Sequence, residues 1–400
     1  MASRVIQHDT MLGPERKGPR KVEAKLFQGP IVHRTALGEV VNRSVIRGSL
    51  NNKAYDNIQK QTSKVIKPKV NSTSTATRIV GKENVGKVKK EQKVPEEKME
   101  VEEMAEVEEL AVAFSVQQLD VDDVDAGDES NPQLVSEYVN DIYRHLRQLE
   151  VENPVSPKYL EGQVITWKMR AILIDWLIQV HTRFTLMPET LYLTVAIIDR
   201  FVQVERNIPR NKLQLVGVTA MFIASKYEEM YCPEIADFAF MTDKACSKAD
   251  IMKMEVVMLK KLKFHISYPL PLHFLRRNSK AGRVDSLQHT LAKYLMELCL
   301  PEYSMCHYKP SMIAGAALYL SLTLLDGLPW SPTLCFYSTY TEDQLMPITC
   351  KMAAILVKST TSKQQAVRTK YQAVKFMKIS DNPQLKSKKV IRLAEKASSY

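Results

Sequence analysis

The sequence predicts an all-α protein built from two similar helical units that follow a long polar N-terminal segment. Three observations support this prediction. Apolar side chains recur at helical spacing from about residue 134 to about residue 370, strand-like alternation is absent there, and one helix pattern occurs twice. The 400 residues, of which 45% are hydrophobic and 25% charged, allow two or three domains with sizeable cores.

Residues 1–130 are expected to be a disordered tail. Residues 1–93 carry 20 basic and 7 acidic side chains, whereas residues 94–130 carry 1 and 14, so residues 131–400 supply the whole net charge of +11. Three aromatic residues and polar tracts such as NSTSTATR leave too little apolar surface to offset the entropy of ordering. The scattered basic charges favour a solvated tail over a nucleic-acid site, and DVDDVDAGDE (120–129) is expected to be a solvated acidic run.

Helical spacing begins after Asn131-Pro132, and Pro, Gly, Asn and Asp then divide the chain into successive helices. We place a first unit with its preceding helix at 131–266, a second unit at 267–370 and a C-terminal extension at 371–400. The two prolines of SYPLPLHF mark the junction. The expected helices are 134–150, 166–184, 189–204, 210–227, 233–240, 247–262, 270–279, 286–299, 309–325, 332–337 and 341–358.

An internal repeat supports the two units. KLQLVGVTAMFIAS (212–225) and KPSMIAGAALYLSL (309–322) are both helical patterns that are dense in small residues. Ala220 aligns with Ala317, 97 residues later. Because small side chains let neighbouring helices approach closely, each copy is expected to be the central helix of its unit.

The motifs of the common enzyme classes are missing. The sequence contains no P-loop, no GxGxxG, no HExxH and no GxSxG. All six cysteines follow residue 231 and none forms a CxxC pair, so no metal or other cofactor is expected, and reduced thiols in a cytosolic or nuclear protein are the default. No apolar run reaches the ~20 residues of a membrane span, and the N-terminus lacks the apolar core of a secretory signal. A binding protein is therefore favoured over an enzyme.

One predicted helix carries more apolar surface than a single core needs. In MRAILIDWLIQV (169–180) apolar side chains occupy both faces, with Arg170 and Asp175 set among them. Periodicity alone places the whole stretch in the core and explains neither charge.

Five motifs then occur in a fixed order: MRAILIDWL (169–177), IIDRF (197–201), KLQLVG (212–217), ASKYEE (224–229) and KMEVVMLKKLKF (253–264). As a set they resemble the cyclin box of the mitotic B-type cyclins, and PLPLHFLRRNSKAG and HTLAKYLMEL are similar to the second B-type subclass. The resemblance covers about residues 134–390. It implies two tandem five-helix cyclin boxes preceded by an extra helix. It also implies a non-catalytic subunit that binds and activates a mitotic cyclin-dependent kinase at the G2/M transition.

The resemblance assigns roles to individual residues. Arg170 is expected to pair with Asp199, because an unpaired arginine in apolar surroundings is strongly destabilising. Lys226 and Glu255 match the kinase-contact pair of the family, whereas the residues alone favour a capping lysine and an exposed glutamate. Further kinase-facing positions are Tyr227, Glu228, Phe264, Ile266, Tyr138, Asp141 and Ile142.

The resemblance also offers a use for the second face of the 169–180 helix, as a docking patch for R-x-L-type substrate peptides. Gln179 stands where S-phase cyclins carry an acidic residue, so docking of basic motifs should be weaker. Ala171, Ile174 and Ile178 are assigned to the core. The docking patch comprises Met169, Ile172, Leu173, Trp176, Gln179, Leu213 and Gln214.

The tail carries degradation signals of the same family. RTALGEVVN (34–42) fits the destruction box through Arg34, Leu37 and Asn42, and Lys82, Glu83 and Asn84 form a KEN sequence. Both imply recognition by the anaphase-promoting complex and ubiquitin-mediated proteolysis. The resemblance further implies shuttling between cytoplasm and nucleus, with the centrosome or spindle as further locations.

Two alternatives share parts of this pattern. A TFIIB-type transcription factor also has tandem cyclin-fold repeats, but it would need an N-terminal zinc ribbon, and the first 231 residues contain no cysteine. A TPR or HEAT array would need three or more repeats of ~34–47 residues, which the spacing does not fit. Neither nucleic acid nor a membrane is an expected partner.

Overall fold

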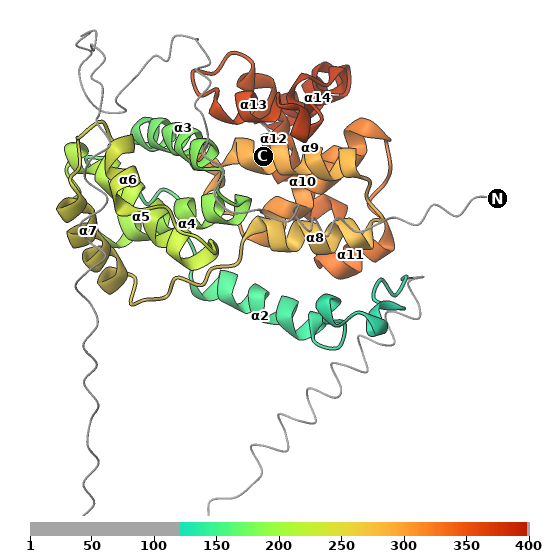
Figure 1. Cartoon of the computed structure of the whole chain (residues 1–400). Helices are drawn as coiled ribbons and strands as arrows, with labels where there is room; N and C mark the ends of the chain where they lie inside the picture. The colour runs from blue at the N-terminus through green and yellow to red at the C-terminus, as the bar shows by residue number, and fades with distance from the viewer. Residues whose placement is uncertain (1–120, 398–400) are drawn as a thin grey trace, which may run out of the picture.

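The computed structural model describes residues 121–397, and every regular element within them is helical. Two helical units lie side by side, which confirms the all-α tandem prediction (Figure 1). The first unit comprises α3 (Trp167–Phe184), α4 (Pro188–Val204), α5 (Leu213–Glu228), α6 (Ile235–Met241) and α7 (Lys248–Lys261). The second comprises α8 (Pro271–Ala281), α9 (Ser286–Cys299), α10 (Pro310–Leu325), α11 (Pro332–Ser338) and α12 (Glu342–Ser359). The helix α2 (Val139–Glu152) precedes them, and α13 (Ala366–Tyr371) and α14 (Lys388–Lys396) follow.

The repeated pattern forms the central helix of each unit, as predicted. The helices α5 and α10 begin at Leu213 and Pro310, 97 residues apart, and both are buried along most of their length. The first packs against α3, α4 and α7, and the second against α8, α9 and α12. Gly217 of α5 permits the closest approach, since a Cβ there would lie 2.7 Å from Leu173 Cδ1. Small residues in these two helices therefore set how closely their neighbours pack.

Local sequence fixes where most helices start. Thr166 caps α3, with its hydroxyl accepting a bond of 3.3 Å from Met169 N. Proline occupies the first position of α4, α8, α10 and α11, where its missing N–H costs nothing. Reciprocal capping boxes begin α7, α9 and α12. These signals explain why the expected helix boundaries agree with the structure to within a few residues.

The first helix begins later than the spacing indicated. The expectation was a helix over 134–150, but Pro132–Leu134 form a short 3₁₀ turn and Val135 adopts the left-handed region at φ 51°. This turn interrupts the apolar spacing, so α2 starts only at Val139.

Residues 121–130, which were assigned to the mostly disordered tail, are part of the folded structure. These residues lie against the second unit and end in a 3₁₀ turn, Asp128–Ser130. Asp125 is in contact with Arg277 and Lys280 of α8, so the acidic run is not simply solvated. The run looked solvated because its partners lie about 150 positions further along the chain, where no local pattern reveals them.

The segment after α12 belongs to the second unit's fold. Helix α14 packs on α12, and α13 lies between α3 and α9 (Figure 1). Glu297 of α9, which is buried, accepts bonds from Lys370 Nζ at 2.7 and 2.9 Å and from Tyr371 OH at 2.7 Å. The C-terminal segment is thereby joined to both units.

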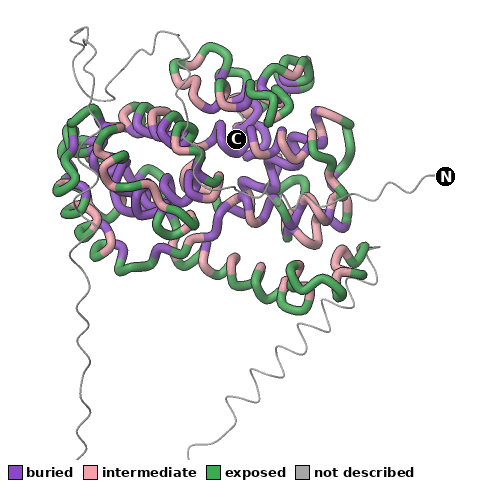
Figure 2. The backbone as a smooth tube through the Cα atoms, viewed as in Figure 1, coloured by how far each residue is buried: buried purple, intermediate pink, exposed green. Residues whose placement is uncertain are grey.

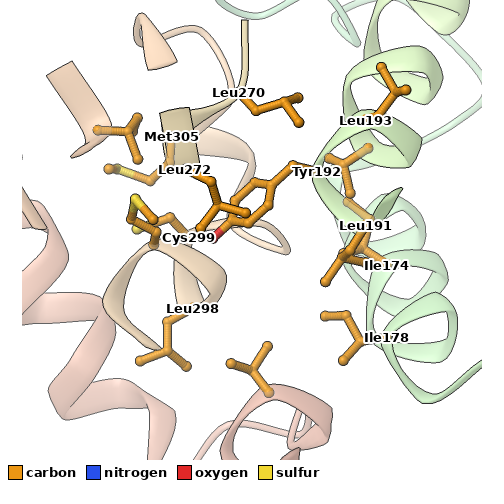
Figure 3. Close-up of a cluster of buried hydrophobic side chains, with 14 of the residues drawn as sticks. Ile174, Ile178, Leu191, Tyr192, Leu193, Leu270, Leu272, Leu298, Cys299 and Met305 are labelled. Carbon is orange, nitrogen blue, oxygen red and sulfur yellow. The ribbon is translucent and has the colours of Figure 1, made fainter. Parts of the chain in front are cut away.

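The cores of the two units are continuous. Figure 2 shows buried residues, in purple, through both bundles and where the two bundles meet. In Figure 3, Ile174 and Ile178 of α3 and Leu191 and Tyr192 of α4 face Leu298 and Cys299 of α9. Ile174 and Ile178 are fully buried, as expected for the core face of α3. Between residues 121 and 397 no helix has both the length and the apolar character needed to cross a membrane.

Candidate functional site

The buried ion pair predicted within the first unit is present. Arg170 Nε and Nη2 donate to the two carboxylate oxygens of Asp199, each at 2.7 Å, and both side chains are almost fully buried. Tyr159 OH donates to Asp199 Oδ1 at 2.7 Å. The carboxylate beside it holds the pKa of Arg170 above its ordinary value, even though burial by itself would lower that pKa.

The same arginine also connects the two units, which the sequence did not indicate. Arg170 Nη1 donates to the carbonyl oxygen of Leu300, just after α9, at 2.9 Å. A cavity of about 80 Å³ lies beside the pair, lined by side chains of both units that include Tyr192, Tyr268 and Cys306. Among the described residues no group of His, Cys, Asp and Glu side chains is arranged to hold a metal ion. The pair is therefore a structural link between the units.

The second predicted pair lies on the surface of the first unit. Lys226, in the last turn of α5, forms an ion pair with Glu255 of α7, and Lys226 Nζ also lies 4.3 Å from the ring centroid of Phe222. The lysine side chain is 45% exposed and the glutamate 15%. A surface pair of this kind contributes little to stability, because its lysine is open to solvent, so the cation is available for contacts outside the chain.

Exposed aromatic side chains accompany this pair. Tyr227 follows Lys226 and is half exposed, whereas Phe264 is 66% exposed and held with Lys263 in the left-handed region at φ 60° and 52°. A left-handed phenylalanine is unfavourable, and a surface aromatic in that state is a feature of binding sites. Burial and the neighbouring carboxylates of Glu189 and Glu229 raise the pKa of Glu228.

The structure does not expose every residue assigned to this surface. Ile266 is only 8% exposed and belongs to the core cluster, because the turn that presents Phe264 directs the next apolar residue inward. The remaining assigned residues lie on α2, where Tyr138 and Ile142 are exposed and Asp141 pairs with Arg144 at 2.7 Å. Helix α2 packs on the second unit, so these residues and the pair lie on different units.

Sequence reasoning missed further apolar residues on the exposed side of the first unit. They were missed because they lie in a loop and on short stretches of helix, where no periodic signal marks them. They are Met230, Tyr231, Phe240, Met252 and Val256, all at least half exposed. Two of them follow α5, the helix of Lys226, and two lie on α7, the helix of Glu255. Phe240 lies on α6, which connects these two helices along the chain. An exposed apolar surface of this kind indicates an interaction site.

The expected docking patch on α3 is smaller than the resemblance implied. Ile172 and Gln179 are exposed, and Met169 and Trp176 are partly buried against the core. Leu173 and Leu213 are fully buried and Gln214 is 7% exposed, because α5 packs directly over this part of α3. The prediction that these three side chains are available on the surface is wrong. The part of the docking patch that is not buried therefore consists of Met169, Ile172, Trp176 and Gln179.

Asp175, which the sequence left without a partner, accepts a hydrogen bond from the backbone N–H of Ala366 at 2.9 Å. It therefore binds the N-terminal end of α13, where a carboxylate is favourable. Gln179 Nε2 donates to the other carboxylate oxygen at 3.3 Å. Burial raises the pKa of Asp175 despite both hydrogen bonds.

The degradation-signal residues Arg34, Leu37, Asn42, Lys82, Glu83 and Asn84 lie outside the described residues.

Comparison with known proteins gives consistent matches. The profile of the cyclin N-terminal domain matches residues 141–267, and that of the cyclin C-terminal domain matches residues 269–385. The G2/mitotic-specific cyclin-B of Patella vulgata is 59% identical over 281 residues, which are 70% of this chain and 69% of the relative. The G2/mitotic-specific cyclin-B2 of Anguilla japonica is 56% identical over 284 residues, which are 70% and 72% of the two chains. The cyclin-B of Arbacia punctulata is 57% identical over 292 residues, 71% of each chain.

Proposed function

This chain belongs to the cyclin family as a mitotic B-type member, and we propose that it is the regulatory subunit that binds and activates a cyclin-dependent kinase at the G2/M transition. The observation that carries this proposal is the Lys226–Glu255 pair, which lies on the same elements as the exposed apolar side chains of the first cyclin box. No residue of the chain is assigned a catalytic role or a cofactor.

The proposed mechanism is allosteric. An inactive kinase holds its αC helix away from the ion pair that orders the ATP phosphates. Packing of Tyr227, Phe264 and the surrounding apolar side chains against that helix stabilises the active arrangement by binding it more tightly than the inactive one. Lys226 and Glu255 then fix the orientation by hydrogen bonds to polar groups at the edge of the contact.

The test is co-purification of the full chain with a cyclin-dependent kinase, followed by measurement of histone phosphorylation. Lys226→Ala with Glu255→Ala should abolish activation without lowering the melting temperature, because a surface pair whose lysine is open to solvent adds little to stability. Lys261→Ala is the matched control. Lys261 lies on the same helix as Glu255, is 47% exposed and pairs with Glu205 at 2.8 Å. Equal loss of activation in the control, or none in the double variant, would reject this surface.

We also propose that the exposed remainder of the docking patch recruits substrate peptides of the R-x-L type. Met169→Ala with Trp176→Ala should reduce phosphorylation of docking-dependent substrates while kinase binding is retained. Trp167→Ala provides the control, because Trp167 is half exposed at the start of the same helix but outside the patch. Loss of kinase binding together with a large fall in melting temperature would show that these side chains serve the core instead.

Finally, we propose that Arg34, Leu37 and Asn42 form a destruction box, and that the KEN sequence at 82–84 is a second signal for the anaphase-promoting complex. The support is the sequence match alone, since both lie outside the described residues. A chain lacking residues 34–42 should persist through mitotic exit, and unchanged turnover would exclude the box. Shuttling between cytoplasm and nucleus, with the centrosome or spindle as further locations, is part of the same proposal and is testable by imaging a tagged full chain.

A further inference from the structure

We propose that a basic surface on the second cyclin box is a binding site for an acidic peptide, and that residues 122–128 of this chain occupy it in cis. We further propose that this occupancy holds α2 in position for the kinase. The basic surface is formed by Arg277 and Lys280 of α8, by Arg283 just after that helix, and by Thr333 and Tyr337 of α11. The role of α2 in kinase contact rests on the proposed function, whereas the basic surface itself does not.

The centre of the basic surface is a closely fitted ion pair. Arg277 Nη1 and Nη2 each donate to one carboxylate oxygen of Asp125 at 2.6 Å, and Lys280 Nζ donates to the same carboxylate at 2.7 Å. The Arg277 side chain is only 5% exposed. Burial would raise the pKa of Asp125, but the hydrogen bonds and charges of the two bases hold it below its ordinary value. A planar guanidinium matched to both oxygens selects a carboxylate with defined geometry.

Two further aspartates and the peptide backbone extend the contact. Arg283 bonds to Asp122 at 3.0 Å, and Lys280 also pairs with Asp128. The acidic side chains thus occur three positions apart. Thr333 Oγ1 accepts from the backbone N–H of Asp122 at 3.3 Å, and Tyr337 OH accepts from that of Val124 at 3.2 Å. Contacts to backbone and side chains together are typical of a peptide site and not of a diffuse charge attraction.

The same arginine also binds α2. Arg277 Nη2 donates to Asn140 Oδ1 at 3.3 Å, and its guanidinium carbon lies 5.6 Å from the ring centroid of Tyr143 and 4.7 Å from that of Tyr337. Among the residues of α2, all of which the structure describes, Glu150 alone is buried. The apolar contact of α2 with the core comes from partly buried side chains, among them Tyr143 and Leu146. Polar links to α8, α10 and α11 add to this packing, and the acidic segment reinforces them.

The coupling is tested in the full chain with Asp125→Asn. We expect kinase affinity to fall on the order of tenfold, because loosened side chains of α2 must be ordered again on binding. Glu129→Gln is the matched control, since Glu129 lies in the same segment, is itself exposed, and loses the same charge on substitution. Unchanged affinity of Asp125→Asn, or an equal fall in the control, would overturn the coupling.

The basic surface is tested without the kinase. A labelled peptide of residues 119–131 is titrated into the unaltered chain and into a full chain with the substitutions Asp122→Asn, Asp125→Asn and Asp128→Asn. We expect saturable, salt-sensitive binding only to the substituted chain, and no binding of a peptide carrying Asp125→Asn. Equal binding to both chains, or none to the substituted chain, would overturn the site. Failure of the unaltered chain to bind any kinase would instead reject the proposed function and leave this result intact.

Discussion

Replacing Arg170 by alanine should destabilise the whole folded region and not only impair kinase activation. The substitution leaves the carboxylate of Asp199 buried without its cation, although the Tyr159 hydroxyl still donates to it. It also leaves the carbonyl oxygen of Leu300 without the Arg170 bond of 2.9 Å that links the two cyclin boxes. Breaking a buried pair by removing one partner costs about 3–5 kcal/mol.

That cost corresponds to a fall in melting temperature of roughly 10 °C, taking about 2–4 °C per kcal/mol for domains of 150–250 residues. The assay is thermal unfolding followed by circular dichroism at 222 nm, with a parallel urea titration. The control is Arg200→Ala on α4, because Arg200 is also buried but is in no ion pair among the described residues, and donates to Asn153 Oδ1 at 3.2 Å. We expect that variant to lose about 1 kcal/mol.

Two results would refute this reasoning. An Arg170→Ala chain that melts like the unaltered protein but no longer activates a kinase would show that Arg170 acts at the binding surface. An equal loss for Arg170→Ala and Arg200→Ala would show that packing of the arginine stems, and not the ion pair, carries the stability.

Three further predictions concern the core. Burial holds the pKa of His181 at about 4, below its ordinary 6.5, so the unfolded chain takes up the proton first as the pH falls. The stability that the neutral side chain contributes is therefore complete above pH 6.5 and is lost as the pH falls from 6.5 to 4. At pH 5 the free energy of unfolding should be lower by about 2 kcal/mol. Urea titrations at pH 7.5 and pH 5 should show this difference, and His181→Gln should reduce it. Gly217→Ala should cost about 1–2 kcal/mol in thermal unfolding, because the new Cβ meets Leu173 inside the core, and a gain in stability would mean that Leu173 can move aside. Glu297→Gln removes the carboxylate from Lys370, which is only 7% exposed, and should cost about 3 kcal/mol and speed hydrogen exchange in α13; unchanged exchange there would show that apolar packing alone holds the helix.

The sequence was most informative where the signal is local. Apolar spacing, together with Pro, Gly, Asn and Asp between the helices, predicted the helix boundaries, and the density of small residues identified α5 and α10 as central. The family motifs identified Arg170 and Asp199 as partners 29 positions apart. The left-handed turn at Val135 was missed, because nothing in the apolar spacing distinguishes a helical turn from a 3₁₀ turn followed by a helix.

By itself the sequence thus determined the helical elements, their order, the repeat and the family, because these follow from short-range hydrogen bonding and from motifs that can be read along the chain. Only the tertiary structure decided which apolar faces are covered. Periodicity shows that a face is apolar but not which helix packs on it. The family resemblance placed Leu173 and Leu213 on the surface, whereas the packing of α5 on α3 buries both side chains. The partner of Asp175 is 191 residues away at Ala366, and that of Asp125 is 152 residues away at Arg277. Such pairs arise when distant segments are brought together by the packing of the core, and no local pattern encodes them.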